Sequence, residues 1–213
     1  MKKKLFIFIL SLFFLLGCDS PGNEQSKKKD NSIKNEVSNT DSKIKAIYEG
    51  NVDAKISLII YESLTCGHCA SFHEDIYPIL KKDFIDTGLA KIEFRNFPLD
   101  LAALNASKIA HCKNDGKSNI LHFLYSNQKE WVQGETIEDL NKNLKKLISE
   151  QNFEINYDKC INNKNIEDYV LNDRISAVKN YNIEATPTLI INDKKFDNPQ
   201  NYKKLKKSLE KLI

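Results

Sequence analysis

The spacing of apolar residues predicts a strand–helix–strand unit in the first half of the chain. Ile56–Tyr61 is apolar and rich in β-branched and aromatic side chains, which predicts a buried strand. From Cys66 to about Lys82 the apolar residues follow helical spacing, at Cys69, Phe72, Ile76, Ile79 and Leu80. Thr87-Gly88 breaks this helix, and Leu89–Phe97 predicts another strand. Two strands joined by such a crossover run parallel.

One strand is predicted before this unit and a long helical region after it. Lys45–Glu49 alternates apolar and polar residues, as a first strand does. Between Leu99 and about Asn182 the pattern is helical throughout. Helices are expected at Leu101–Cys112, after a Ser118 cap, after a capping-box-like start at Thr136 with Asp139, from Asn156 or Asp158 through Cys160, and at Ile166–Val178. These helices have too many apolar faces to stand alone, so we expect a lobe packed beside the sheet.

Sheet structure is predicted again near the C-terminus. Ala185–Ile191 forms a strand whose Pro187 cannot donate to a ladder, which indicates a strand edge or a special turn. Asn192–Lys194 predicts a hairpin turn, Lys195-Phe196 a short last strand, and Pro199–Ile213 a closing helix. The pattern predicts an α/β domain with a central mixed sheet, flanking helices and an inserted helical lobe at about 99–182.

The first 17 residues have the composition of an export signal. Lys2–Lys4 are positive, and the twelve apolar-rich residues Leu5–Leu16 are too few to span a membrane. Leu15-Leu16-Gly17-Cys18 resembles a bacterial lipoprotein signal, in which the cysteine is lipidated and becomes the new N-terminus. Ordinary cleavage nearby, leaving Cys18 as a free thiol, is the alternative. We expect a signal peptide at 1–17 and a periplasmic protein anchored to a membrane through Cys18.

Removing this signal changes the charge of the chain. Three of the 32 basic residues lie in it, so 29 basic residues remain against 29 acidic ones. This neutral balance does not favour nucleic acid as a partner. In residues 18–43 the composition is strongly polar, which predicts a lipidated end and a disordered tether. Residues 44–213 are enough for one compact domain.

The chemistry concentrates at Cys66-Gly67-His68-Cys69, between the predicted strand and its helix. A helix N-terminus has unpaired N–H groups and partial positive charge, which stabilise a thiolate at Cys66. Cys69 lies one turn further on the same face, and His68 adds a group that can carry positive charge. Such settings lower a cysteine pKa from about 8.5 to as little as about 3.5. The motif therefore predicts a redox-active dithiol.

A metal site is the main alternative for this motif. Cys66 and Cys69 with His73 provide three ligands for copper or zinc, although no second Cys-x-x-Cys or His-x-x-x-His supplies a fourth. A protein that uses the fold only to bind peptides is a third possibility. The other two histidines, His111 and His122, are expected to be packed or surface residues.

The number of cysteines allows a second disulfide in the domain. With Cys18 lipidated, four cysteines remain in an exported domain, where disulfides are stable. If Cys66 and Cys69 form the active pair, only Cys112 and Cys160 are left to pair with each other. The alternative is that both are buried free thiols.

The order of elements from about residue 44 to 213 resembles the DsbA family, which has a thioredoxin-like fold with a helical insertion. The residues that carry the resemblance are Cys66–Cys69, Phe72-His73, Phe94–Leu99 and Ala185–Thr188. It implies that Pro187 is cis and lies against the active disulfide, that Thr186 offers its backbone to a bound peptide, and that Cys112 and Cys160 form a non-catalytic disulfide.

Two departures from the best-known member of that family leave questions open. The dipeptide Gly67-His68 and Thr186 resemble the disulfide isomerase branch, so oxidase, isomerase and reductase activities all stay possible. The buried acid six residues before the first active cysteine is replaced by Ile60, and Glu62 is a nearby candidate for its role.

The resemblance implies a protein disulfide oxidoreductase that acts on unfolded or folding exported proteins and is re-oxidised by a membrane redox partner. Its chemistry requires no metal, nucleotide or flavin.

Overall fold

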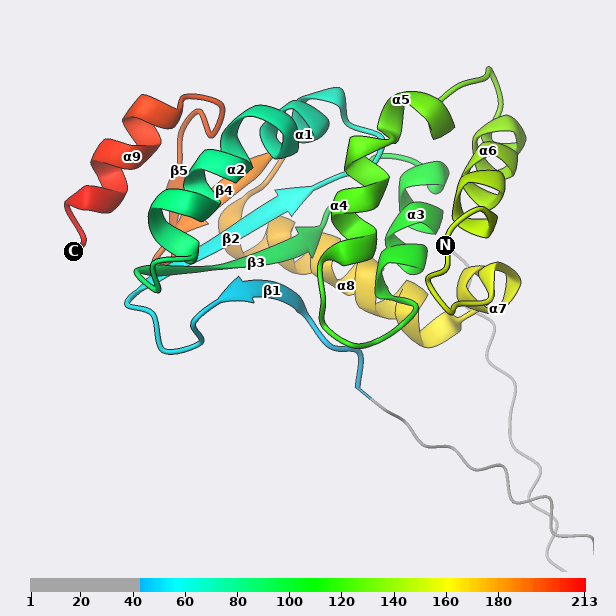
Figure 1. Ribbon diagram of the computed structural model, residues 1–213, viewed down its shortest axis with the longest axis horizontal. Coiled ribbons are helices and arrows are strands. Elements are labelled where there is room, and N and C mark those ends of the chain that lie inside the picture. The colour runs from blue at the N-terminus through cyan, green and yellow to red at the C-terminus, as the bar shows by residue number, and fades with distance from the viewer. Residues whose placement is uncertain (1–42) are drawn as a thin grey trace, which may run out of the picture. The chain divides into compact units, whose positions relative to one another are not determined.

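The computed structural model describes residues 43–213, which form a five-stranded mixed sheet with helices on both faces (Figure 1). The predicted signal peptide at 1–17, Cys18 and nearly all of the predicted tether lie outside the described residues. The strand order is β1-β3-β2-β4-β5. The strands are β1 (Ile47–Gly50), β2 (Ile56–Glu62), β3 (Ala90–Asn96), β4 (Thr188–Ile191) and β5 (Lys194–Phe196).

The predicted strand–helix–strand unit is confirmed. Strands β2 and β3 run parallel, with Ile56 opposite Ala90 and Glu62 opposite Asn96. The other three strand pairs are antiparallel. Side chains of β2 alternate between the two faces of the sheet, so Ile60 and Glu62 point to the same face.

The helix after β2 is longer and less regular than predicted. It runs without a break from Gly67 to Ile85 as α1 (Gly67–Ser71), η1 (Phe72–Ile76), α2 (Tyr77–Leu80) and η2 (Lys81–Ile85). The two η segments are π-helical. Pro78 has no N–H to donate and its ring crowds the preceding turn, which accounts for the wider turn at η1.

The predicted helical region lies between β3 and β4. It comprises α3 (Leu101–His111), α4 (Asn119–Ser126), α5 (Gln128–Trp131), α6 (Ile137–Ser149), α7 (Tyr157–Ile161) and α8 (Lys164–Tyr181). Thr136 and Asp139 form the predicted capping box of α6, and Asn156 caps α7. Ser118 occupies the N-cap position of α4, as predicted, but its hydroxyl donates to Glu49 and not to the helix backbone.

The two strands and the closing helix predicted near the C-terminus are present in the predicted order, but the first strand and the helix are shorter than predicted. Strand β4 begins at Thr188 rather than Ala185, because Pro187 cannot join the ladder. The turn at Asn192-Asp193 has positive φ at both residues and leads into β5. The closing helix α9 spans only Tyr202–Glu210.

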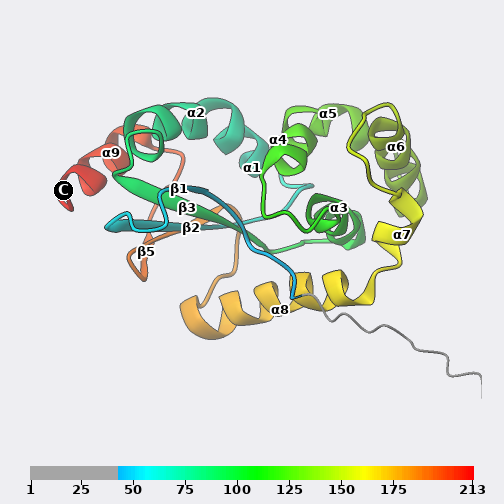
Figure 2. The same ribbon diagram turned by 60° about the horizontal axis from the view of Figure 1, so that its bottom comes forward.

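The helices form layers around the sheet, as the turned view shows (Figure 2). Helices α1, α2 and α9 lie over one face, α8 lies over the opposite face, and α3 to α7 gather beside the ends of the strands. One apolar core joins the sheet to the lobe and includes Leu58, Phe72 and Trp131. A smaller one, with Tyr61, Phe97 and Ile190, lies under α8. Among the described residues, no helix combines the length and the apolar character needed to cross a membrane.

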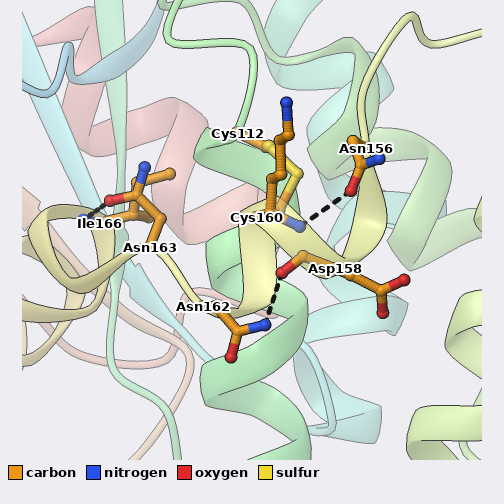
Figure 3. Close-up of a disulfide and its surroundings, with 8 residues drawn as sticks. Cys112, Asn156, Asp158, Cys160, Asn162, Asn163 and Ile166 are labelled. Carbon is orange, nitrogen blue, oxygen red and sulfur yellow. Dashed lines mark hydrogen bonds between the residues drawn. A yellow bond between two sulfur atoms is a disulfide. The ribbon is translucent and has the colours of Figure 1, made fainter.

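Cys112, at the end of α3, forms a disulfide with Cys160 in α7 (Figure 3). Their Cα atoms are 5.3 Å apart. The backbone N–H of Cys160 also donates to the carbonyl of Asn156, in the first turn of α7. The bond fastens the short helix α7 to the body of the helical lobe.

We expect removal of this disulfide by Cys112→Ala with Cys160→Ala to lower the free energy of unfolding. The bond joins residues 48 apart, and constraining a loop of that length in the unfolded chain contributes about 4 kcal/mol. Urea denaturation of the oxidised protein and the variant measures the difference. A loss below about 1 kcal/mol would contradict the idea that this crosslink restricts the unfolded chain.

Candidate active site

The dithiol lies where β2 ends and α1 begins. Cys66 occupies the N-cap position in an extended conformation, and its carbonyl accepts from the N–H groups of Cys69 and Ala70 at 3.1 Å each. Cys66 is half-buried, and Cys69 is fully buried. Both thiols are free, so the pair is in its reduced form.

The environment of Cys66 favours its thiolate. A hydrogen bond from the Cys69 thiol is the main cause that lowers the Cys66 pKa to about 5, and burial opposes it. The pKa is lowered further by contact with Thr186 and by the backbone N–H groups of Cys69 and His68. His68 therefore contributes its backbone, while its imidazole is exposed to solvent.

The environment of Cys69 favours its thiol. Burial raises the Cys69 pKa well above its ordinary value, and the neighbouring Cys66 and the charge of Glu62 raise it further. The backbone N–H of Ser63 acts weakly in the opposite direction. The two sulfurs are therefore unequal: one is a half-exposed anion, and the other is a buried proton donor.

Thr186 and Pro187 lie against this pair from the start of β4. The Cys66 sulfur lies 3.5 Å from the Thr186 carbonyl oxygen, to which it donates when it is protonated. The Thr186–Pro187 peptide bond is cis. The side-chain hydroxyl of Thr186 is buried without a hydrogen-bond partner in the described chain. This arrangement brings a backbone carbonyl next to the reactive sulfur.

Three polar residues far away in sequence fix the active-site turn. The amide of Gln128 donates to the carbonyls of Leu64 at 2.8 Å and Cys66 at 3.1 Å. The Thr65 hydroxyl donates to Asp100 at 2.7 Å. The amide of Gln200 donates to the carbonyl of His68 at 2.7 Å. Sequence analysis missed Gln128, Asp100 and Gln200, because single polar residues in helices or loops give no local signal of such contacts.

His73 does not join the two cysteines. Its side chain is only 5% exposed, and both ring nitrogens are engaged, Nε2 by Glu62 at 2.8 Å and Nδ1 by His122 at 3.1 Å. Within residues 43–213, no three His, Cys, Asp or Glu side chains converge in a way that could hold a metal ion. The geometry thus does not support the predicted Cys66, Cys69 and His73 metal site.

The other two histidines differ from each other. His111 is buried, which agrees with the expectation of a packed or surface histidine, and burial lowers its pKa to about 4. His122 takes part in a row of hydrogen bonds, since its Nε2 lies 2.7 Å from an oxygen of Glu49. This row, Glu49–His122–His73–Glu62, links four elements of the fold, and no sequence motif marks it.

Comparison with known proteins gives one consistent result. Residues 42–211 match the family described as Thioredoxin. Disulfide bond formation protein D of Bacillus subtilis is 31% identical over 174 residues, which are 77% of this chain and 75% of that protein. A putative protein-disulfide oxidoreductase of Rickettsia bellii is 30% identical over 70% of this chain, but the match spans only 58% of that protein.

Solved structures agree with these relatives. The crystal structure of Wolbachia pipientis alpha-DsbA1 superposes with a TM-score of 0.69 at 31% identity, covering 78% of this chain and 90% of that one. Oxidised BdbD from Bacillus subtilis gives 0.64 at 26% identity, covering 78% and 92%. The chain therefore belongs to the thioredoxin family and, within it, to the DsbA-type thiol:disulfide oxidoreductases.

Proposed function

We propose that this protein introduces disulfide bonds into unfolded or folding exported proteins, with Cys66 and Cys69 as its catalytic residues. The observation that carries the proposal is the unequal placement of the two sulfurs: Cys66 is half-buried at the N-cap of α1, which lowers its pKa, and Cys69 is fully buried, which raises its pKa. A stabilised thiolate favours the reduced enzyme, so the disulfide form is a strong oxidant.

In the first step a substrate thiolate attacks the Cys66 sulfur of the oxidised enzyme. The Cys66–Cys69 bond breaks, a mixed disulfide forms, and Cys69 leaves with the electron pair and takes up a proton. A second substrate thiolate then attacks the substrate sulfur of the mixed disulfide. Cys66 leaves as a stabilised thiolate, and the substrate departs oxidised by two electrons. A low leaving-group pKa speeds this last exchange.

Thr186 and Pro187 are proposed to guide the substrate. The Thr186 carbonyl oxygen lies 3.5 Å from the Cys66 sulfur, so a peptide lying along this segment would bring its own sulfur to the reactive one. Extended peptides commonly bind by adding backbone hydrogen bonds in this manner. Gly67 supports access because it is exposed and bears no side chain.

We further propose the domain plan and location that the sequence predicts. Residues 1–17 would direct export, lipidated Cys18 would anchor the protein in the periplasm, and residues 18–43 would tether the domain at 44–213. A membrane redox partner would re-oxidise the dithiol. The disulfide between Cys112 and Cys160 would remain structural.

The reactivity of Cys66 is the direct test of the proposed catalyst. We expect the rate of alkylation at Cys66, mapped by peptide mass spectrometry, to rise with a midpoint near pH 5, following its lowered pKa. In Cys69→Ala the midpoint should move upward, because the main hydrogen-bond donor is gone. A midpoint near that of a free cysteine, about 8.5, would refute the proposal.

The redox potential and the oxidative refolding activity together test the proposed oxidase against the reductase and isomerase alternatives. We expect the redox potential measured against glutathione to lie near the value of about −120 mV for DsbA. A value near that of thioredoxin, about −270 mV, would indicate a reductase instead. Cys66→Ser should abolish oxidative refolding of a reduced multi-cysteine substrate, whereas Cys112→Ala with Cys160→Ala should retain it at a temperature where that variant is folded.

The pH dependence of stability gives an independent check. The Cys66 pKa is lower in the folded reduced state than in the unfolded state, so the thiolate stabilises the folded state. This contribution is fully present above the unfolded pKa of about 8.5 and is lost progressively as the pH falls to and through about 5. We expect the reduced protein to melt at a higher temperature than the oxidised one at pH 7.5, with the gap closing at pH 4.5. In the control Cys66→Ser, the melting temperature should lack this pH-dependent contribution. An equal difference in melting temperature between the reduced and oxidised unsubstituted protein at both pH values would contradict a lowered Cys66 pKa.

Lipid attachment is tested on the intact protein. Mass spectrometry of the membrane-extracted chain should show that residues 1–17 are absent and that Cys18 carries the mass of a lipid. Cys18→Ser should move the protein to the soluble fraction. An unmodified Cys18 thiol in membrane-extracted protein would rule out this anchor.

A further inference from the structure

The surface formed by β5 and α9 is strongly basic, although the domain as a whole is nearly neutral. Residues 192–213 contain seven lysines and three acidic residues, a formal charge of +4. Residues 43–191 contain 18 basic and 21 acidic residues, a formal charge of −3. Helix α9 lies at the end of the domain away from the helical lobe (Figures 1 and 2), so this positive charge is concentrated on one side of the fold.

The spacing of residues in α9 separates an apolar face from a basic one. Leu205 and Leu209 are fully buried and belong to the apolar core that joins the sheet to the lobe. Lys204, Lys207 and Lys211 are exposed, and their spacing of three and four residues places them on one face of the helix. The leucines therefore fix the helix to the sheet and leave a row of ammonium groups in solvent.

Most lysines of this surface have no partner for their ammonium group. Lys206 pairs with Asp83 at 2.8 Å, and Lys195 donates to the carbonyl of Asn182 at 3.1 Å. The other lysines of residues 192–213 form no ion pair or side-chain hydrogen bond with the described part of the chain; these are Lys194, Lys203, Lys204, Lys207 and Lys211. Like charges one helical turn apart repel each other, so an anionic partner would stabilise this surface.

A groove of about 520 Å³ lies between β5 and α9. Four lysines line it, with the hydroxyl of Ser208, the amide of Asn198 and a single acid, Asp197. The four are Lys195, Lys204, Lys207 and Lys211. Ammonium, hydroxyl and amide groups all donate hydrogen bonds, and charge-assisted bonds to phosphate oxygens are among the strongest that side chains form. The groove therefore suits a phosphate group.

Exposed apolar side chains lie next to the basic surface. Leu212 and Ile213 follow Lys211 directly and are 41% and 65% exposed. Together with Leu89 they line a second hollow at this end of the domain. Lysines beside exposed apolar side chains are typical of surfaces that lie in the headgroup region of a bilayer, where ammonium groups meet phosphates and apolar groups leave water. This combination favours a membrane surface over a free anion.

We propose that the surface of β5 and α9 binds the phosphates of anionic phospholipid headgroups and so orients the domain on a membrane. Leu212 and Ile213 enter the boundary between headgroups and acyl chains. The segment before α9 contacts the active-site helix, because Gln200 donates to the carbonyl of His68. Membrane contact through α9 therefore keeps the dithiol near the bilayer. This inference goes beyond the proposed disulfide chemistry and does not depend on it.

The test compares lysine reactivity in the full-length chain mixed with two kinds of vesicle. One kind contains only zwitterionic phosphatidylcholine, and the other contains equal amounts of phosphatidylcholine and anionic phosphatidylglycerol. A short pulse of an uncharged acetylating reagent, followed by peptide mass spectrometry, measures the acetylation rate of each lysine. Three exposed lysines of the helical lobe, Lys142, Lys146 and Lys159, are the control lysines in the same molecule.

We expect acetylation of Lys195, Lys204, Lys207 and Lys211 to be slower by at least about threefold on the phosphatidylglycerol vesicles, because each ammonium group near an anionic surface is held there electrostatically. The control lysines should react at the same rate on both kinds of vesicle. High salt should remove the difference, since it screens the attraction.

Two variants with the same change in net charge separate the position of the lysines from their number. Lys204→Gln with Lys207→Gln and Lys211→Gln should abolish the slowing at Lys195. Glutamine at all three control lysines should leave that slowing intact. All six side chains are exposed, so neither variant removes a packing contact of the core.

Three results would overturn the proposal. They are no slowing on phosphatidylglycerol vesicles, equal slowing of the control lysines, and equal slowing by inorganic phosphate on phosphatidylcholine vesicles, which would identify a site for a free anion. Alkylation of Cys66 in the same samples reports the dithiol separately. A failure of the proposed disulfide chemistry is therefore distinguishable from a failure of membrane binding.

Discussion

The chemistry of this fold depends on keeping one sulfur charged and the other protonated within one helical turn. A free thiolate in a half-buried position loses hydration, and here that loss is offset by the Cys69 thiol and by backbone N–H groups at the start of α1. The same burial keeps the proton on Cys69. Because the thiol donates to the thiolate, each sulfur maintains the state of the other. The reduced pair is thereby stabilised at neutral pH.

This inequality requires a rigid turn, and the helical lobe supplies part of that rigidity. Gln128, at the start of α5, ties down two carbonyls of the turn, and Asp100, just before α3, holds Thr65. Trp131 is fully buried and donates to the Leu124 carbonyl, so α5 is itself fixed against α4. The lobe is therefore part of the active-site framework, and its shared core with the sheet holds it in place.

Local signals in the sequence were sufficient to predict most helices and strands and the reactive Cys-x-x-Cys motif. Apolar periodicity predicted the parallel pair β2 and β3, and the spacing of Cys66 and Cys69 predicted a thiolate at a helix start. Contacts between distant segments could not be predicted in the same way. Neither Gln128 nor Gln200 differs in its local sequence from an ordinary surface glutamine, and only the assembled fold brings them to the turn. The π-helical turns were missed for a similar reason, since periodicity fixes the face of a helix but not the width of each turn.

The position of Glu62 shows how the end of a strand can accommodate a buried acid. Side chains two residues apart on a strand share a face, so Glu62 lies on the same face of β2 as the core residue Ile60. Glu62 is the last residue of β2, and its Oε2 lies 2.8 Å from His73 Nε2. A carboxylate buried there without a partner would be costly, and the imidazole of His73 offsets that cost with a charge-assisted hydrogen bond. His73 Nδ1 lies 3.1 Å from His122 Nδ1, so both ring nitrogens of this buried imidazole have hydrogen-bond partners. His122 thereby completes the polar contacts of the side chain that pairs with the buried acid.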